Sequence, residues 1–207
     1  MIELFFDVET TGLPPRNASP SCYEKYDGCR VVSIAWVLRD STSIYSQRYS
    51  VCDPCILEKE IGAEFIHGIS REIIDKYGNP IETVIHEFMD DVRKSDIIVA
   101  HNIAFDKNVV SAELYRMGSP TDADELLNHK NLCTMMSTIN VVKAKNKWGS
   151  NKWPKLEELH MFLFKEGFGN AHHALADIEA LSRCYYTLME KHNGSKKDGI
   201  AGNRTQV

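Results

Sequence analysis

The N-terminal quarter of the chain consists of short apolar runs separated by polar turns, a pattern typical of β-strands. Three runs have the length and the β-branched or alternating content of strands. They are Ile2–Val8, Val31–Leu38 and Ile44–Val51. Because the connections between them are short, we expect an antiparallel meander.

From Ser70 onward the apolar positions recur with helical spacing. Ser70–Tyr77 predicts a short helix with Ser70 as its N-cap. The next stretch, PIETVIHEFMDDVRKS, begins with Pro80 and places its apolar residues on one helical face. These residues are Ile81, Val84, Ile85, Phe88, Met89 and Val92. The remaining predicted elements are a buried strand at Ile97–Ala100 and helices at Phe105–Met117, Lys155–Phe164 and Ala174–His192.

This order of elements predicts an α/β fold, a mixed sheet flanked by helices, in one domain over residues 1–193. Residues 194–207 are rich in Gly, Ser, Lys and Asn, so we expect a tail without fixed structure. The chain has 207 residues, of which 43% are hydrophobic and 26% charged, as is usual for a soluble domain.

Two acidic residues and the overall charge bear on the location of the protein and on how it could bind nucleic acid. Asp7 and Glu9 interrupt the first apolar run too early for a secretory signal, and no apolar run approaches the length of a membrane span. We therefore expect a cytoplasmic or nuclear protein with no membrane partner. The net charge of -5 argues against a protein that coats duplex DNA, but not against an enzyme that grips only a strand end.

The cysteines leave two interpretations open. In an intracellular setting we expect reduced thiols. Cys52 and Cys55 have metal-ligand spacing, and Cys22 and Cys29 could in principle complete a zinc site. The looser spacing of the second pair favours the alternative, surface thiols in loops.

Candidate chemistry begins where the first strand ends. Residues two apart on a strand share a face, so Asp7 and Glu9 point the same way if the strand continues through them. Two carboxylates this close repel each other, and a divalent cation removes the conflict. Mg²⁺ prefers a few carboxylates together with water and phosphate oxygens.

Two later stretches each place an aspartate near the start of a predicted helix. Asp106 follows the strand and turn of IIVAHN, and Asp177 lies in the first helical turn after GNAHHALA. Each is preceded by a histidine, His101 and His172 respectively. Taken singly, each aspartate is explained as a helix-start carboxylate and His172 as a solvated loop residue. The ordered set, each member in a matching strand or helix context, favours a shared site.

The segments FFDVETTGL, HNIAFD and HHALAD resemble the three motifs of the DEDDh, or DnaQ-like, family of 3′–5′ exonucleases. This family includes the proofreading exonuclease subunit of replicative DNA polymerases. FIHGIS, at residues 65–70, is similar to the His-Gly-Ile-Thr turn of the family, and the resemblance extends from Ile2 to about Leu188. It implies a ribonuclease-H-like fold with a mixed five-stranded sheet whose first three strands are antiparallel.

The resemblance also implies roles for individual residues. It makes Asp7, Glu9, Asp106 and Asp177 the ligands of two divalent cations, Mg²⁺ or Mn²⁺. It makes His172 the general base, because this histidine stands five residues before Asp177. The tyrosine form of the family would need a tyrosine at position 173, which is His173, and this second histidine is the alternative base to exclude.

Further residues are assigned to the substrate by the same resemblance. Thr10 is placed near the terminal 3′-hydroxyl, and Leu13 is either a wedge between the last two bases or a buried core leucine. Three residues either line the nucleotide pocket or merely pack and cap a helix. They are His101, Asn102 and Phe105.

A basic and aromatic stretch, VVKAKNKWGSNKWPK, lies before the last two helices. This stretch contains five lysines and two tryptophans and no acidic residue. They are Lys143, Lys145, Lys147, Trp148, Lys152, Trp153 and Lys155. We name residues 143–155 the Lys–Trp segment. The pattern is typical of a track for single-stranded nucleic acid. The alternative is a solvated loop in which Trp153 packs under the next helix.

The sequence thus predicts a metal-dependent 3′–5′ exonuclease that acts on the 3′ end of single-stranded DNA, with a DNA polymerase as a possible partner. One alternative is an exoribonuclease that trims RNA 3′ ends. Another is a non-catalytic module that binds nucleic acid or a polymerase, against which the five filled catalytic positions argue. The sequence does not predict the oligomeric state.

Overall fold

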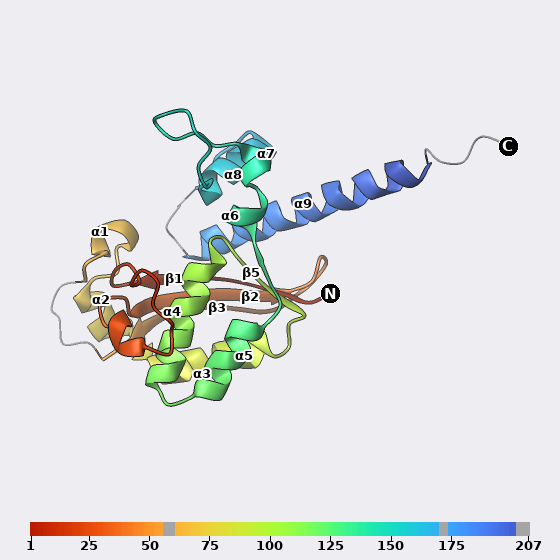
Figure 1. Ribbon diagram of the computed structural model, residues 1–207. Coiled ribbons are helices and arrows are strands. Elements are labelled where there is room, and N and C mark those ends of the chain that lie inside the picture. The colour runs from red at the N-terminus through yellow and green to blue at the C-terminus, as the bar shows by residue number, and fades with distance from the viewer. Residues whose placement is uncertain (56–60, 170–173, 202–207) are drawn as a thin grey trace.

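A mixed β-sheet forms the centre of the computed structural model, which describes residues 1–55, 61–169 and 174–201 (Figure 1). The strand order is β4-β3-β2-β1-β5-β6. Neighbouring strands among β1 (Glu3–Thr10), β2 (Val31–Arg39) and β3 (Ile44–Asp53) pair antiparallel. The strand β5 (Ile97–Ala100) is parallel to β1, which confirms the predicted mixed sheet with three antiparallel strands.

Two short strands complete the sheet. The strand β6 (Asn131–Cys133) pairs parallel with β5, and the two-residue β4 (Asn79–Pro80) pairs parallel with the end of β3. In the described part of the chain the sheet therefore has six strands rather than the expected five. Neither β4 nor β6 is long enough to show a period of two in its sequence, so the apolar pattern did not predict them.

Helices cover both faces of this sheet. On one face lie α3 (Ile81–Val92), α4 (Ile103–Arg116) and α5 (Pro120–Asn128), whereas α9 (Ala174–Ala201) crosses the other (Figure 1). The 3-10 turn Tyr23–Tyr26, α1 (Glu64–His67) and α2 (Arg71–Tyr77) lie near one end of the strands. The helices α6 (Thr134–Ser137), α7 (Ile139–Val142) and α8 (Leu156–Phe164) follow β6.

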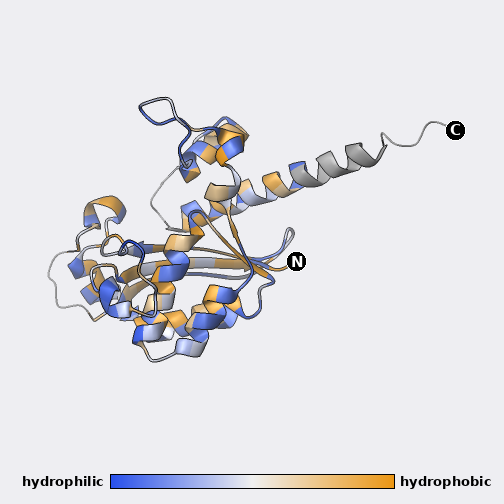
Figure 2. Cartoon of the chain, in the orientation of Figure 1, coloured by the Kyte–Doolittle hydropathy of each residue, from blue (hydrophilic) through white to orange (hydrophobic). Residues whose placement is uncertain are grey.

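The alternation of β1 separates two hydrophobic cores. Leu4, Phe6 and Val8 pack into the core shared with α3, α4 and α5. Phe5 faces the other way, into the core shared with Ile178 and other residues of α9. In Figure 2 the central strands carry much of the apolar colour, whereas the loop between α7 and α8 is mainly hydrophilic.

Several local predictions agree with the structure. All six apolar residues predicted on one face of α3 are buried. The Ser70 hydroxyl accepts a hydrogen bond from the Ile73 N–H at 3.4 Å, as expected of an N-cap. The helix α4 begins at Ile103, two residues earlier than predicted.

The C-terminal helix is longer than the sequence predicts. It continues to Ala201, so residues 194–201 are helical where we expected a tail without fixed structure. Once a helix has formed, each added residue gains a backbone hydrogen bond, and no proline interrupts this stretch. Residues 202–207 lie outside the described residues.

The cysteines differ from the expected surface thiols in two cases. Cys29 and Cys52 are buried, and burial raises the pKa of their thiols to about 11 and about 12 respectively. Cys22 and Cys55 are exposed. In the described residues no group of three His, Cys, Asp or Glu side chains is arranged to hold one metal ion.

Among the described residues, no helix has both the length and the apolar content needed to span a membrane.

Candidate active site

The end of β1 projects beyond its parallel neighbour. Pairing between β1 and β5 stops at Phe5, whereas β1 continues to Thr10. Asp7 and Glu9 share a face of the strand with Phe5, which is the face covered by α9. The two carboxylates therefore line the β1 side of an opening between β1 and α9.

Asp106 reaches this opening from the other side of the sheet. The chain turns sharply from β5 into α4 through Asn102, whose φ of 74° lies in the left-handed region that asparagine tolerates. One helical turn later, the Asp106 carboxylate is only 2% exposed and accepts a hydrogen bond from the Val8 N–H at 3.1 Å. This bond occupies the side of β1 that β5 leaves uncovered.

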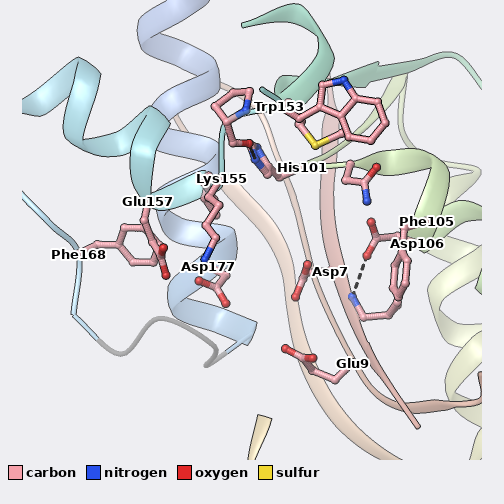
Figure 3. A pocket seen from close by; sticks show the side chains of 15 residues that line it. Asp7, Glu9, His101, Phe105, Asp106, Trp153, Lys155, Glu157, Phe168 and Asp177 are labelled. Atoms are coloured by element: carbon pink, nitrogen blue, oxygen red, sulfur yellow. Dashed lines mark hydrogen bonds between the residues drawn. The ribbon is translucent and has the colours of Figure 1, made fainter. Parts of the chain in front are cut away.

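Asp177 is brought in by the packing of α9. Its neighbour Ile178 and Leu181, one turn later, pack in the same core as Phe5. Asp7, Glu9, Asp106 and Asp177 consequently line one cavity of about 400 Å³. Figure 3 shows Asp7 and Glu9 pointing from β1, and Asp177 from α9, toward the same space.

Burial and mutual repulsion dominate the electrostatics of this cavity. Burial, and then the neighbouring carboxylates, raise the pKa of Asp7 well above its usual value. The pKa of Glu9 rises to about 7, chiefly through burial and secondly through the charge of Asp177. Burial also raises the pKa of Asp106 to about 7, although the hydrogen bond from Val8 opposes the shift. The cavity therefore disfavours several negative charges unless a cation compensates them.

The donor chemistry of the four carboxylates fits Mg²⁺ or Mn²⁺. These hard cations take oxygen ligands, and Mg²⁺ keeps water and phosphate oxygens beside one or two carboxylates. In the described part of the chain no three His, Cys, Asp or Glu side chains are arranged to hold one ion by themselves, so a cation here would need water or phosphate oxygens as further ligands.

His101 lines the cavity and is also bound within the protein. Its Nε2–H donates to the Pro154 carbonyl at 2.9 Å, because a carbonyl can only accept. Its Nδ1 is then left to accept from the Thr134 hydroxyl, also at 2.9 Å. Burial lowers the pKa of this imidazole, which favours the neutral ring that this arrangement needs. His101 therefore lines the cavity and is also held by contacts within the protein, and its role toward a nucleotide stays a prediction.

Phe105 and Asn102 also line the cavity. Asn102 is the N-cap residue of α4 but its side chain makes no capping hydrogen bond. Seven of the ten predicted site residues therefore meet at this cavity. They are Asp7, Glu9, His101, Asn102, Phe105, Asp106 and Asp177.

Thr10 ends β1 and Leu13 lies in the turn that follows, and neither lines the cavity. Thr10 is buried, and its hydroxyl donates to the Gly12 carbonyl at 2.7 Å, so it serves the turn itself. Leu13 is 86% exposed, so the alternative of a buried core leucine is wrong. The wedge role stays a prediction.

The turn is supported from two neighbouring segments. A Cβ on Gly12 would stand 2.7 Å from the Gly28 carbonyl oxygen, so only glycine permits this approach. His67, in the predicted FIHGIS turn, donates from Nε2 to the Thr10 carbonyl at 3.2 Å and accepts from the Ile69 N–H at Nδ1. The FIHGIS turn therefore holds the chain after Glu9 in place.

Other lining residues were not predicted as site residues. Trp153 and Lys155 belong to the Lys–Trp segment, whose basic and aromatic pattern was the available signal. Trp153 is 62% exposed, so it does not pack under the next helix. Met135, Glu157 and Phe168 also line the cavity and carried no sequence signal. His172 and His173 lie outside the described residues.

A known family model matches most of this chain. The RNase_T family model, described as an exonuclease family, matches residues 4–185. The chain belongs to this exonuclease family. A search of curated proteins found no match.

Solved structures of other exonucleases share the fold of this family member. E. coli exonuclease I bound to a 5cy-dT13 oligonucleotide has a TM-score of 0.66 and 19% identity, and the match covers 99% of this chain and 43% of that one. Exonuclease X in complex with 5′ overhanging duplex DNA has a TM-score of 0.54 and 21% identity, with 93% of each chain covered.

A 3′-exonuclease described by its recognition of a histone mRNA stem-loop has a TM-score of 0.61 and 13% identity, covering 89% of this chain and 62% of that one. The chain thus spans less than half the length of exonuclease I but nearly the whole of exonuclease X.

Proposed function

We propose that this chain is a divalent-metal-dependent exonuclease that removes nucleotides one at a time from the 3′ end of single-stranded DNA. The observation that carries the proposal is the convergence of four carboxylates from β1, α4 and α9 on one cavity. Membership of an exonuclease family supports the reaction class.

The carboxylates are the proposed ligands of the metal ions. Two Mg²⁺ or Mn²⁺ ions held by Asp7, Glu9, Asp106 and Asp177 would activate a water molecule and stabilise the leaving oxygen of a phosphodiester. The hydrogen bond from Val8 fixes the Asp106 carboxylate, so this ligand is oriented before substrate arrives.

The proposed proton acceptor is His172. An imidazole with an ordinary pKa of about 6.5 can take the proton of the attacking water near neutral pH. The water oxygen bonds to phosphorus, and the bond from phosphorus to the 3′ oxygen of the preceding nucleotide breaks. The terminal nucleotide leaves as a 5′-monophosphate, and the shortened strand ends in a 3′-hydroxyl.

The turn after Glu9 supports the proposed polarity. Leu13 is exposed at 86% directly downstream of a metal-ligand candidate, which suits a side chain that wedges between the last two bases. Thr10 is the proposed neighbour of the terminal hydroxyl, through the backbone of the turn, since its own hydroxyl is bonded to Gly12.

The proposed sugar preference is for DNA. The FFDVETTGL segment is similar to proofreading exonucleases, and one structure of similar fold binds a dT13 oligonucleotide. The same resemblance suggests proofreading or repair in the cytoplasm or nucleus, with a DNA polymerase as partner. RNA trimming is the alternative, since another structure of similar fold binds an mRNA stem-loop.

A gel assay tests the reaction and its polarity. Purified protein with Mg²⁺ or Mn²⁺ should convert a 5′-labelled single-stranded DNA into a descending ladder, and EDTA should abolish it. Asp7→Ala is the matched inactive variant. Early release of the 5′ label as a mononucleotide would reverse the polarity, and faster digestion of the matched RNA would reverse the sugar preference.

A further inference from the structure

The lysines of the Lys–Trp segment have different surroundings. The Lys145 ammonium donates to the Asn151 side chain at 2.7 Å, and the Lys147 ammonium lies over the Trp148 ring. Lys152 pairs with Glu158 at 2.7 Å. Of the five lysines in the segment, Lys155 is the one that lines the carboxylate cavity.

The backbone on both sides of Lys155 is held in place. The preceding carbonyl, of Pro154, accepts the hydrogen bond from His101 Nε2 at 2.9 Å. The Lys155 N–H donates to the Glu158 carboxylate at 2.8 Å at the start of α8. Because Thr134 binds the other ring nitrogen of His101, the imidazole links the end of β5 to the start of α8 in one orientation.

The side chain of Lys155 extends into the cavity opposite the sheet. Figure 3 shows it projecting between Glu157 and Asp177, with Asp7 and Glu9 across the space. A phosphate that approaches the four carboxylates meets their negative charge, so a cation at this position lowers the electrostatic cost of its approach. An ammonium on a flexible stem is a common phosphate ligand and acts as a point charge.

We propose that Lys155 binds a non-bridging phosphate oxygen of the terminal nucleotide, and that His101 is the positioning residue that holds Lys155 at the cavity through Pro154. The inference rests on the proposed function of this cavity, which it extends by naming a phosphate contact supplied by the protein.

Binding of the reaction product tests the contact without turnover. Thymidine 5′-monophosphate and thymidine are titrated by calorimetry in Mg²⁺ into the wild type and Lys155→Gln. Loss of a charged hydrogen bond should weaken monophosphate binding by about 10- to 100-fold. Thymidine binding should not change. Lys130→Gln, an equal loss of charge at an exposed residue outside the cavity, should match the wild type for both ligands.

A metal titration excludes an indirect effect. Lys155→Gln should bind Mn²⁺ in the absence of nucleotide at least as tightly as the wild type, because it removes a positive charge beside the carboxylates. Weaker Mn²⁺ binding by this variant would overturn the inference, since loss of monophosphate would then follow from loss of metal.

A double-mutant cycle tests the role of His101. His101→Phe removes the donor to Pro154 and should reproduce the monophosphate loss of Lys155→Gln, and the double variant should lose no more than either. His101→Gln keeps an N–H donor and should rescue binding. Additive losses would show a general structural effect and contradict the positioning role. Melting curves check folding, and His101→Gln decides the matter if His101→Phe is unfolded.

The outcomes separate this inference from the proposed function. Strand digestion by the wild type together with unchanged monophosphate binding by Lys155→Gln would overturn the inference alone, as would digestion without measurable monophosphate binding. Absence of digestion together with a monophosphate loss in Lys155→Gln would keep the phosphate contact and overturn the proposed reaction.

Discussion

The carboxylate of Asp106 shows how this site shifts the pKa of a single residue. It is buried at 2% exposure beside other acids, and it accepts hydrogen bonds from the backbone N–H groups of Val8 and of Asp106 itself. The same burial raises the pKa of Glu9 and Asp106 to about 7, against ordinary values of 4.5 and 3.8. The folded chain therefore holds protons that the unfolded chain has released between about pH 4 and pH 7.

This difference predicts that, without metal, the free energy of unfolding falls as pH rises through that window. The raised pKa values stabilise the fold fully below the unfolded pKa values and lose that contribution by about pH 7. Thermal melts in EDTA should show a lower Tm at pH 8 than at pH 5.5. Mg²⁺ should raise the Tm mainly at pH 8, where the ligands are ionised.

Asp7→Asn provides the control for this prediction. It removes one of the repelling charges, so in EDTA at pH 8 it should melt at a higher temperature than the wild type, and Mg²⁺ should stabilise it less. A lower Tm for Asp7→Asn under these conditions would show that the carboxylate is stabilised by its surroundings rather than repelled.

The two adjacent histidines give a second prediction at the residue scale. His172→Ala should lower kcat by roughly a hundredfold or more, the usual loss for a general base, while Mn²⁺ binding is retained. His173→Ala should have a much smaller effect. Kinetics on a short labelled strand measure both, and a larger loss for His173→Ala would mean that the third motif is aligned one residue off.

At the scale of elements, one buried ion pair ties α4 to the sheet. Arg30 donates to Glu113 through Nε at 2.8 Å and Nη2 at 3.0 Å, and the two side chains are 10% and 1% exposed. The Arg30 N–H also donates to the Thr11 hydroxyl at 2.9 Å. The pair thus connects the helix that carries Asp106 with the turn that follows Glu9.

Breaking this pair should destabilise the protein strongly. Glu113→Gln leaves a buried guanidinium without its counter-charge, which typically costs about 3–5 kcal/mol of unfolding free energy. Urea unfolding measures the loss. Asp75→Asn, which removes an exposed helical partner of Arg71, should cost less than about 1 kcal/mol. Equal losses for both variants would show that burial does not set the contribution of these pairs.

Residues 143–152, the part of the Lys–Trp segment that does not line the cavity, are predicted to bind the strand upstream of the terminal nucleotide. Changing Lys145, Lys147 and Lys152 together to Ala should weaken binding of long single strands more than of dinucleotides, which are too short to reach the segment. Trp148, which is 77% exposed, should contribute about 1–3 kcal/mol if a base stacks on it. Fluorescence anisotropy in Ca²⁺ compares the two lengths, and an equal loss for both would indicate a role in the fold instead.

At the scale of the whole molecule, a net charge of -5 repels a polyanion. The protein must therefore bind the strand through local contacts, at the proposed metal ions, Lys155 and the Lys–Trp segment. If roughly two or three phosphates are neutralised, log Kobs should fall with log salt with a slope of only about -2, far from the steep dependence of duplex-coating proteins. Binding of a long strand in Ca²⁺ at several salt concentrations measures the slope, and a value several times steeper would contradict a local grip.

The sequence by itself determined the features that depend on local periodicity. A period of two along β1 set Asp7 and Glu9 on one face, and helical spacing set the buried face of α3. The motifs around Asp7, Asp106 and Asp177 led to the exonuclease family that the family model confirms. These predictions succeeded because burial on one side of a strand or helix leaves a repeated pattern in neighbouring residues.

Only the tertiary structure decided which distant segments meet. The burial of Cys29 and Cys52, the exposure of Leu13 and the short strand β6 have no local period that predicts them. The link from His101 to Pro154 joins residues 53 positions apart and brings Lys155 to the carboxylates. Such contacts are set by how whole elements pack against the sheet, so no pattern of neighbouring residues encodes them.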